Sequence, residues 1–264
     1  MARVLIRGSG DVGSAVAHLL LHSGHAVVIH DVALPAAPRR GMAFADAIFD
    51  GTCELAGVRA RRVELDTLRD DERGDEVLVS TAPEFGDVLA AVLPDVLVDA
   101  RMRKRAQPEP QRGLAPLTIG LGPNFVAGET TDVAIETQWG DALGAVVTRG
   151  PTQPLGGEPR AFEGHGRDRF VYAPVDGVMR TQAAIAQPVV AGETVATIGD
   201  EPLHAPLDGI LRGLVHDGVP VAVGAKVLEV DPRRDLSKVF GIGPRPRRIA
   251  EGVLEAMQVG AGEV

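Results

Sequence analysis

Three glycines near the N-terminus have the spacing of a phosphate-binding turn. The run Gly8-Ser9-Gly10-Asp11-Val12-Gly13 follows an apolar segment and precedes a stretch with helical periodicity that ends near His22. In such a turn the first glycine permits a tight bend, the second lets a pyrophosphate approach the backbone, and the third lets the helix pack on the strand. The N-terminus of the helix adds free N–H groups and a partial positive charge. We therefore predict that this run binds the phosphates of a nucleotide, through Gly8, Ser9, Gly10, Asp11, Val12 and Gly13.

An acidic residue follows the next apolar segment. Asp31 lies 21 residues beyond Gly10, where a carboxylate can accept hydrogen bonds from both hydroxyls of a ribose. This favours a free 2′-hydroxyl, as in NAD, but Arg39 and Arg40 could reach the 2′-phosphate of NADP. The two arginines could equally belong to a solvated loop, and the glycine turn could be a scaffold that no longer binds a ligand.

Four further polar residues follow strand-like segments. Asp99 and Arg101 come after the fifth such segment, while Asn124 and Glu136 come later, in a stretch rich in glycine and proline. Because ligands of α/β proteins bind at the carboxyl edge of the sheet, all four could face a pocket there. Asn124 and Glu136 could also be ordinary loop and strand-end residues.

Strand-like and helix-like segments alternate through the first half of the chain. This alternation predicts a parallel, doubly wound sheet of the Rossmann-like α/β class. The expected strands are Ala2–Arg7, Ala26–Ile29, Val58–Val63, Glu76–Thr81, Asp95–Ala100 and Pro116–Leu121, and the expected helices after the first are Ala43–Phe49, Asp87–Leu93 and, near the C-terminus, Arg247–Met257.

The second half contains an internal repeat. Ala173–Arg180 recurs as Ala205–Arg212, and the same offset of 32 relates Pro188 to Pro220 and Gly192 to Gly224. Neither copy could bury its apolar residues alone, so two copies should interlock around one core. The pattern resembles the barrel-sandwich hybrid of biotinyl and lipoyl carriers. The hairpin Gly199–Leu203 between the copies lacks the carrier lysine, so we expect no biotin or lipoate and interpret the domain as a docking or oligomerisation element.

Composition limits the classes of partner. The chain has 264 residues, a net charge of −9 and one cysteine, and its longest apolar runs are only strand-sized. These features argue against nucleic-acid binding, a membrane span, a disulfide and a cysteine-rich metal site, and they favour a cytoplasmic protein. A strand that begins within three residues of Met1 leaves no room for a signal peptide. No standard catalytic set is present, so no catalytic residue is assigned, and whether the chain is an enzyme stays open.

Several segments, taken in order along the chain, resemble one family. The YqeB-type accessory proteins of the selenium-dependent molybdenum hydroxylase system are similar at Ile6–Val12, Phe44–Gly51, Gly120–Gly128, Ala134–Thr137, Asp231–Arg233 and Gly252–Ala256. The N-terminal part is also similar to the dinucleotide-binding domain of XdhC-type maturation factors. The resemblance implies a maturation role for a molybdenum hydroxylase client and a molybdopterin-type nucleotide as ligand. With a single cysteine, the chain offers no obvious selenium or sulfur relay.

The sequence therefore predicts an arrangement in four parts: a nucleotide-binding domain (1–122), a connecting segment (123–165), the repeat domain (166–232), and a linker with a C-terminal helix (233–264). The predicted function is maturation of a molybdenum hydroxylase, with an NAD(P)-dependent oxidoreductase as the alternative. A homo-oligomer is compatible with either function.

Overall fold

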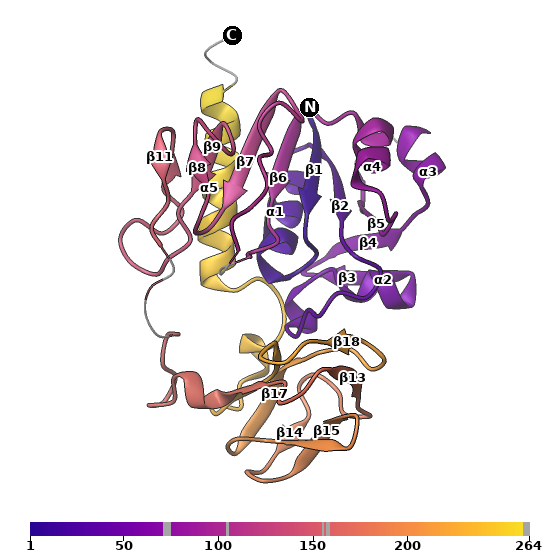
Figure 1. Ribbon diagram of the computed structural model, residues 1–264, viewed down its shortest axis with the longest axis vertical. Coiled ribbons are helices and arrows are strands. Elements are labelled where there is room, and N and C mark those ends of the chain that lie inside the picture. The colour runs from indigo at the N-terminus through magenta and orange to yellow at the C-terminus, as the bar shows by residue number, and fades with distance from the viewer. Residues whose placement is uncertain (71–74, 104–105, 155, 157–158, 261–264) are drawn as a thin grey trace.

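The computed structural model describes residues 1–70, 75–103, 106–154, 156 and 159–260 (Figure 1). A nine-stranded sheet with its helices forms one part, and two four-stranded sheets below it form the other. Among these residues, no helix is both long enough and apolar enough to span a membrane.

The large sheet has β1 (Arg3–Arg7) near its centre, in the order β10-β9-β7-β6-β1-β2-β5-β4-β3. The strands from β9 to β4 run parallel, whereas the edge strands β3 and β10 are antiparallel to their neighbours. The remaining strands of this sheet are β2 (Ala26–His30), β3 (Thr52–Leu55), β4 (Val58–Arg62), β5 (Val77–Ser80), β6 (Val96–Asp99), β7 (Leu117–Leu121), β9 (Val133–Ile135) and β10 (Val146–Val147). β8 (Val126–Ala127) and β11 (Gly150–Pro151) pair separately.

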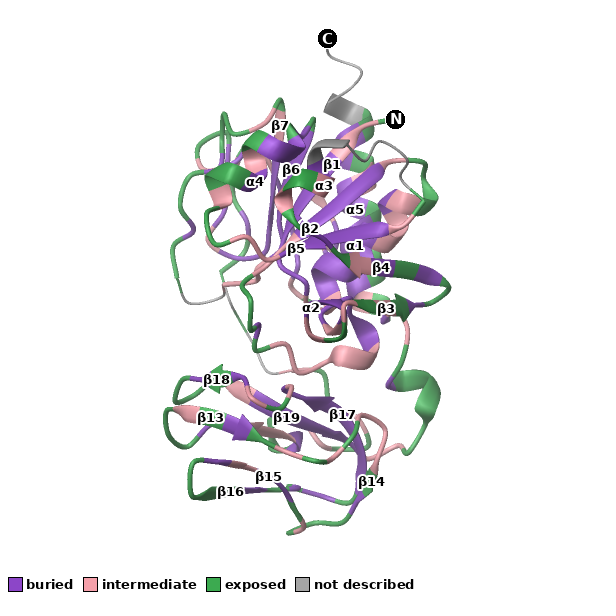
Figure 2. Cartoon of the chain, turned by 90° about the vertical axis from the view of Figure 1, so that its right-hand side faces the viewer, coloured by how far each residue is buried: buried purple, intermediate pink, exposed green. Residues whose placement is uncertain are grey.

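Both faces of the sheet are covered, because successive side chains of a strand point to opposite sides. Val4 and Ile6 of β1 share a buried core with α1 and α5, while Leu5 packs on the other face with α3 and α4. Figure 2 shows these strands as buried. The helices are α1 (Asp11–His22), α2 (Asp46–Asp50), α3 (Leu65–Asp70), α4 (Phe85–Val92) and α5 (Pro244–Gly260), with short 3₁₀ turns η1 (Arg40–Met42), η2 (Arg167–Arg169) and η3 (Leu236–Lys238).

The two copies of the repeat form the second part by exchanging strands. Gly177 of β13 pairs with Val221 of β18, and Gly209 of β17 pairs with Val189 of β14, so each pairing is the other shifted by 32 residues. Two aspartates at equivalent positions also link the copies. Asp176 accepts a hydrogen bond from the backbone N–H of Val223, and Asp208 accepts one from that of Ala191. One apolar core lies between the sheets, which confirms that neither copy buries its apolar residues alone. The strands are β12 (Phe170–Tyr172), β13 (Gly177–Arg180), β14 (Pro188–Val189), β15 (Thr194–Ile198), β16 (Glu201–His204), β17 (Gly209–Leu214), β18 (Pro220–Val221) and β19 (Lys226–Asp231).

The predicted fold class is wrong. Instead of a Rossmann-like, parallel doubly wound sheet with a separate barrel-sandwich hybrid, the chain has a large nine-stranded mixed sheet with few helices, beside two four-stranded sheets. The prediction failed at the edges, where β3 and β10 turn back as hairpin partners. It failed also in the connecting segment, because β9 and β10 join the large sheet. The predicted domain limits stay a prediction.

The two parts contact each other through the loop after β2. The N–H of Leu214 donates to the carbonyl of Pro38, and the Arg40 side chain donates back to the carbonyl of Leu214. The ring of Phe49 stacks on that of His216, with 4.0 Å between centroids. These contacts hold β17 and β19 against the loop, so that side chains of both parts face a shared space.

Candidate anion-binding cavity

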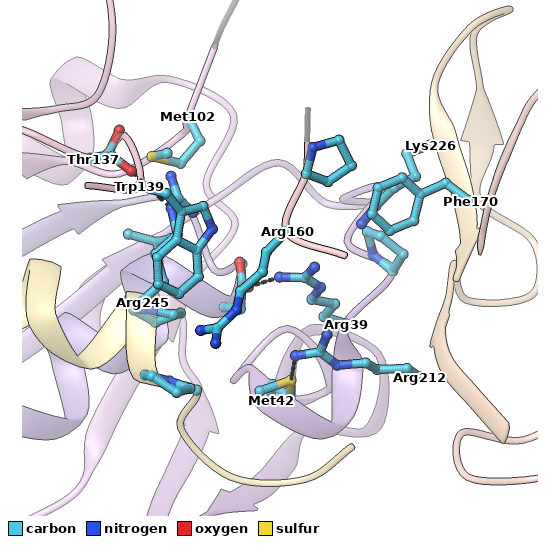
Figure 3. A pocket seen from close by; sticks show the side chains of 18 of the residues that line it. Arg39, Met42, Met102, Thr137, Trp139, Arg160, Phe170, Arg212, Lys226 and Arg245 are labelled. Atoms are coloured by element: carbon cyan, nitrogen blue, oxygen red, sulfur yellow. Dashed lines mark hydrogen bonds and ion pairs between the residues drawn. The ribbon is translucent and has the colours of Figure 1, made fainter. Parts of the chain in front are cut away.

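A cavity of about 1460 Å³ lies between the two parts (Figure 3). Its upper wall is made by segments that follow the carboxyl ends of β1, β2, β6 and β9, and its lower wall by β12, β17, β19 and the chain that leads into α5. This is the edge of a parallel sheet at which ligands usually bind.

The cavity is strongly basic although the chain is acidic. Among its described lining residues ten are lysine or arginine and three are acidic, in a chain of net charge −9. The basic residues are Arg39, Arg103, Arg160, Arg167, Arg169, Arg212, Lys226, Arg233, Lys238 and Arg245, and the acidic residues are Asp11, Glu136 and Glu163. A concave surface with this excess of cations concentrates anions.

One buried carboxylate organises the centre of this charge. Glu229 of β19 is fully buried and contacts four cations, which we call the Glu229 cluster. Its oxygens accept from Arg39 Nε at 2.9 Å, Arg169 Nη1 at 2.5 Å, Arg212 Nη1 at 3.1 Å and Lys226 Nζ at 2.8 Å. Burial acts to raise the pKa of Glu229, but Arg39, Lys226 and Arg212 hold it well below its ordinary value. Asp11 also pairs with Arg39, and the buried Asp231 lies 3.9 Å from Arg212, but these carboxylates together with Glu229 are still outnumbered by the four cations of the cluster.

Arg169 shows most directly that the cluster has fewer acceptors than donors. Its side chain is only 2% exposed, yet its Nε has no hydrogen-bond partner among the described residues. Its guanidinium carbon lies 4.4 Å from the ring centroids of both Phe162 and Phe170. An unpaired buried donor is costly, so this group is ready to bind an acceptor.

Lys226 shares the cluster but differs from the arginines. Burial, and then repulsion by Arg39, lowers the pKa of Lys226 to about 8, although Glu229 opposes this shift. Burial also lowers the pKa of Arg245 at the start of α5, whose Nε donates to the carbonyl of Thr137. A ligand with negative charge would relieve the repulsion among these cations.

The glycine turn has the local geometry that its sequence predicts. Gly8 has φ +108°, and a Cβ on Gly13 would lie 2.1 Å from the carbonyl oxygen of Gly8. Nothing lies within 4 Å of a Cβ on Gly10, which is the N-cap of α1. Gly10, Asp11 and Val12 line the cavity. This end of α1 is therefore open to a ligand.

Asp31 is already occupied. Its Oδ2 accepts from both the backbone N–H and the hydroxyl of Ser9 at 2.7 Å, and its Oδ1 accepts from the N–H of Val32. In this arrangement the carboxylate holds the glycine turn in place. A role in binding a ribose stays a prediction.

Of the other predicted site residues, some line the cavity and the rest make local contacts. Arg39 and Glu136 line the cavity, but Glu136 is buried and accepts from the backbone N–H groups of Thr137, Gln138 and Gln153. It thus shapes the wall. Four further predicted residues make local contacts: Arg40 pairs with Asp46, Arg101 pairs with Asp99, which was also predicted, and the Asn124 amide donates to the carbonyl of Ala106.

Sequence reasoning missed most of the basic wall. Arg160 and Arg169 lie nine residues apart, Arg212 and Arg245 are far from them and from each other in the chain, and no local motif joins the four. One signal was present in the repeat. The first copy has Thr194 and Thr197 at the positions where the second copy has Lys226 and Glu229. Charged residues at these positions in one copy alone indicate that the two copies face different environments there. The described residues include no group of three or more His, Cys, Asp or Glu side chains that could hold a metal ion.

A curated protein is similar over nearly the whole chain. The uncharacterized protein YqeB of Escherichia coli strain K12 is 37% identical over 259 residues, which make up 97% of this chain and 47% of the relative. This similarity supports the assignment of the chain to the YqeB family. The chain spans about half the length of the YqeB protein that it matches. No family model matches the chain.

Solved structures give weaker likenesses. A product-bound structure of the ectoine utilization protein EutE (DoeB) from Ruegeria pomeroyi has 13% identity and a TM-score of 0.25, covering 87% of this chain and 85% of that one. A succinylglutamate desuccinylase/aspartoacylase from Rhodobacter sphaeroides has 17% identity and a TM-score of 0.23, covering 83% and 61%. A succinylglutamate desuccinylase from Silicibacter sp. TM1040 has 14% identity and a TM-score of 0.25, covering 87% and 84%. Scores of this size do not establish a shared fold, so none of these activities is carried over.

The functions predicted from the sequence are not borne out by these comparisons. The curated relative is uncharacterized, and the solved structures are named as an ectoine utilization protein or as succinylglutamate desuccinylase/aspartoacylase proteins, not as molybdenum hydroxylase maturation factors or oxidoreductases. We therefore do not retain the predicted maturation role or the alternative of an NAD(P)-dependent oxidoreductase. The predicted Rossmann fold, molybdenum cofactor and lipoyl-like barrel-sandwich hybrid are likewise without support.

Proposed function

We propose that the chain binds a small molecule with several negative charges and a planar ring in the cavity between its two parts. The observation that carries this proposal is the Glu229 cluster, in which four cations share one buried carboxylate, and the Nε of Arg169 has no hydrogen-bond partner within the described part of the chain. Bringing these cations together is unfavourable unless an anion completes their pairing.

The chemistry of the wall supports a phosphate or a carboxylate as the anion. The planar guanidinium of arginine presents several N–H donors that match two oxygens of such a group. Phosphates also bind at helix N-termini, and the first residues of α1 line this cavity. Charge and geometry thus favour the same class of ligand.

An aromatic side chain supports the planar ring. Trp139 lines the cavity, is 43% exposed, and has the guanidinium carbon of Arg160 at 5.4 Å from its ring centroid (Figure 3). A ligand ring could stack on this indole. NAD(P) and a molybdopterin-type nucleotide, the cofactors predicted from the sequence, carry both a ring and phosphates and are the first ligands to test. A molybdenum hydroxylase partner and a homo-oligomer stay untested predictions.

Calorimetric titration tests the proposal. Pyrophosphate, NAD, NADP and molybdopterin are titrated into the wild-type protein and into Arg245→Gln, which removes a cation of the wall. We expect at least one ligand to bind, and Arg245→Gln to weaken it about 10- to 100-fold, the value of a hydrogen bond to a charged group.

The repeat provides a control with the same substitution outside the cavity. Arg180 in the first copy is equivalent to Arg212 in the second, but its side chain is 63% exposed and does not line the cavity. Arg180→Gln should bind as the wild type does. If no ligand binds, or if both variants weaken binding equally, the cavity is not an anion site.

A further inference from the structure

We propose that Lys226 forms an imine with an anionic aldehyde or ketone held in the cavity. This inference rests on the proposed function, because the arginines would hold the anionic group of the same ligand. It adds a covalent step to a site so far described only as binding.

The position of Lys226 suits a nucleophile. Its side chain projects from β19 into the cavity and is 26% exposed, so the amine is sheltered but accessible. Its Nζ lies 2.8 Å from Glu229 and 4.4 Å from the ring centroid of Phe170 (Figure 3). The ring covers one side of the amine, which limits its contact with water.

The surrounding charges allow the amine to lose its proton. Glu229 remains paired with Arg39, Arg169 and Arg212 when Lys226 is neutral, so deprotonation leaves no uncompensated buried charge. The groups that act on Lys226 are Glu229 on its own strand, with Arg39 and Asp11 on the opposite wall. Burial and a neighbouring cation are the two means by which proteins activate a lysine amine. The lowered pKa of Lys226, about 8, agrees with this arrangement.

The step balances without a further reagent. The ammonium first releases a proton to solvent, and the lone pair of Nζ then attacks the carbonyl carbon to give a carbinolamine. The hydroxyl of the carbinolamine then takes one proton back from solvent and leaves as water, and Nζ becomes a protonated imine. No electron donor or acceptor is needed. The protonated imine carries the same charge as the ammonium, so the Glu229 cluster keeps its charge balance.

Reductive trapping tests the step, with pyridoxal 5′-phosphate as the anionic aldehyde. The folded wild-type chain is incubated with the probe at pH 7.5, reduced with borohydride and mapped by peptide mass spectrometry. The chain has only three lysines, and Lys238 also lines the cavity but is 49% exposed and pairs with Asp235. We expect at least about tenfold more adduct on Lys226 than on Lys238, because the amine of Lys226 is partly neutral at this pH and the neutral amine is the nucleophile.

Two further measurements connect the adduct to the cavity. Pyridoxal without its phosphate should label Lys226 about tenfold less, and labelling should rise with pH through about 8, where the amine becomes neutral. Lys226→Arg should lose the cavity adduct, whereas Lys238→Arg should keep it, with the fold of each checked by circular dichroism.

The outcomes separate this inference from the proposed function. A wild-type protein that binds one of the titrated anions but shows no preferred adduct on Lys226 overturns the inference and leaves the binding function standing. Equal labelling of Lys226 and Lys238, or labelling that does not depend on the phosphate, also overturns it. Failure of every anion to bind in calorimetry contradicts the proposed function itself.

Discussion

The glycine turn after β1 and the Glu229 cluster differ in how their polar groups are paired. In the turn, the Asp31 carboxylate accepts three hydrogen bonds from Ser9 and Val32, so it is occupied by its own neighbours. In the cluster, residues separated by up to 190 positions bring four cations to one carboxylate. The glycine motif thus predicts the backbone conformation of a turn, whereas the excess of positive charge in the Glu229 cluster indicates side chains that can still bind an anion.

The largest effect that would test this comparison is the loss of the cluster carboxylate. Glu229→Gln removes the buried anion that the four cations share, and we expect the free energy of unfolding to fall by about 3–5 kcal/mol. Denaturant unfolding followed by circular dichroism measures it. Glu109→Gln is the control, because Glu109 also contacts three arginines but its side chain is 46% exposed, and it should cost about 1 kcal/mol or less. Similar losses in both variants would mean that burial does not distinguish the cluster.

The second effect concerns the shape of the turn. Gly13→Ala places a methyl group 2.1 Å from the carbonyl oxygen of Gly8, and we expect a loss of about 1–3 kcal/mol from the strain of overpacking. Gly10→Ala, with open space around its Cβ, should change stability by less than about 1 kcal/mol. Thermal unfolding of both variants compares them. An equally tolerant Gly13 would show that the close approach of α1 to β1 is not required.

A third effect is a dependence of stability on pH that comes from Lys226. The pKa of Lys226 is about 8 in the folded chain, below its ordinary value of 10.5, so the unfolded chain binds more protons between these two values. The free energy of unfolding should therefore rise with pH from about 8 to 10.5. Denaturant unfolding across this range compares the wild type with Lys226→Met, in which this contribution to the slope is absent. Identical slopes would show that the cluster does not perturb the lysine.

Local patterns predicted the elements better than the architecture. The apolar periodicity of 2–30 is enough for β1, α1 and β2, because each is stabilised by contacts within one short stretch. β3 was missed because its alternation covers only Thr52–Leu55, and its antiparallel pairing depends on a hairpin with β4. The mixed sheet that contradicts the predicted class arises from such edge pairings.

The candidate site was predictable only in part. The turn residues Gly10, Asp11 and Val12 do reach the cavity, since a strand followed by a helix places them at the sheet edge. Arg169 and Arg212 were not predicted, because their role depends on how β12 and β17 pack beside β19. Their spacing in the sequence has no periodicity that shows this contact.

The exchange of strands between the repeat copies has a consequence for synthesis of the chain. β13 pairs with β18, and β14 with β17, so the first copy leaves the ribosome without the strands that complete its sheets. Its apolar residues therefore stay exposed until the second copy has been synthesised. This part folds late, and the exposed residues make it prone to self-association before then. Glu229, on the last strand of that copy, reaches Arg39 only at the end. Because Arg245 at the start of α5 also lines the cavity, the cavity is complete only after translation has passed residue 245, however early the glycine turn has formed.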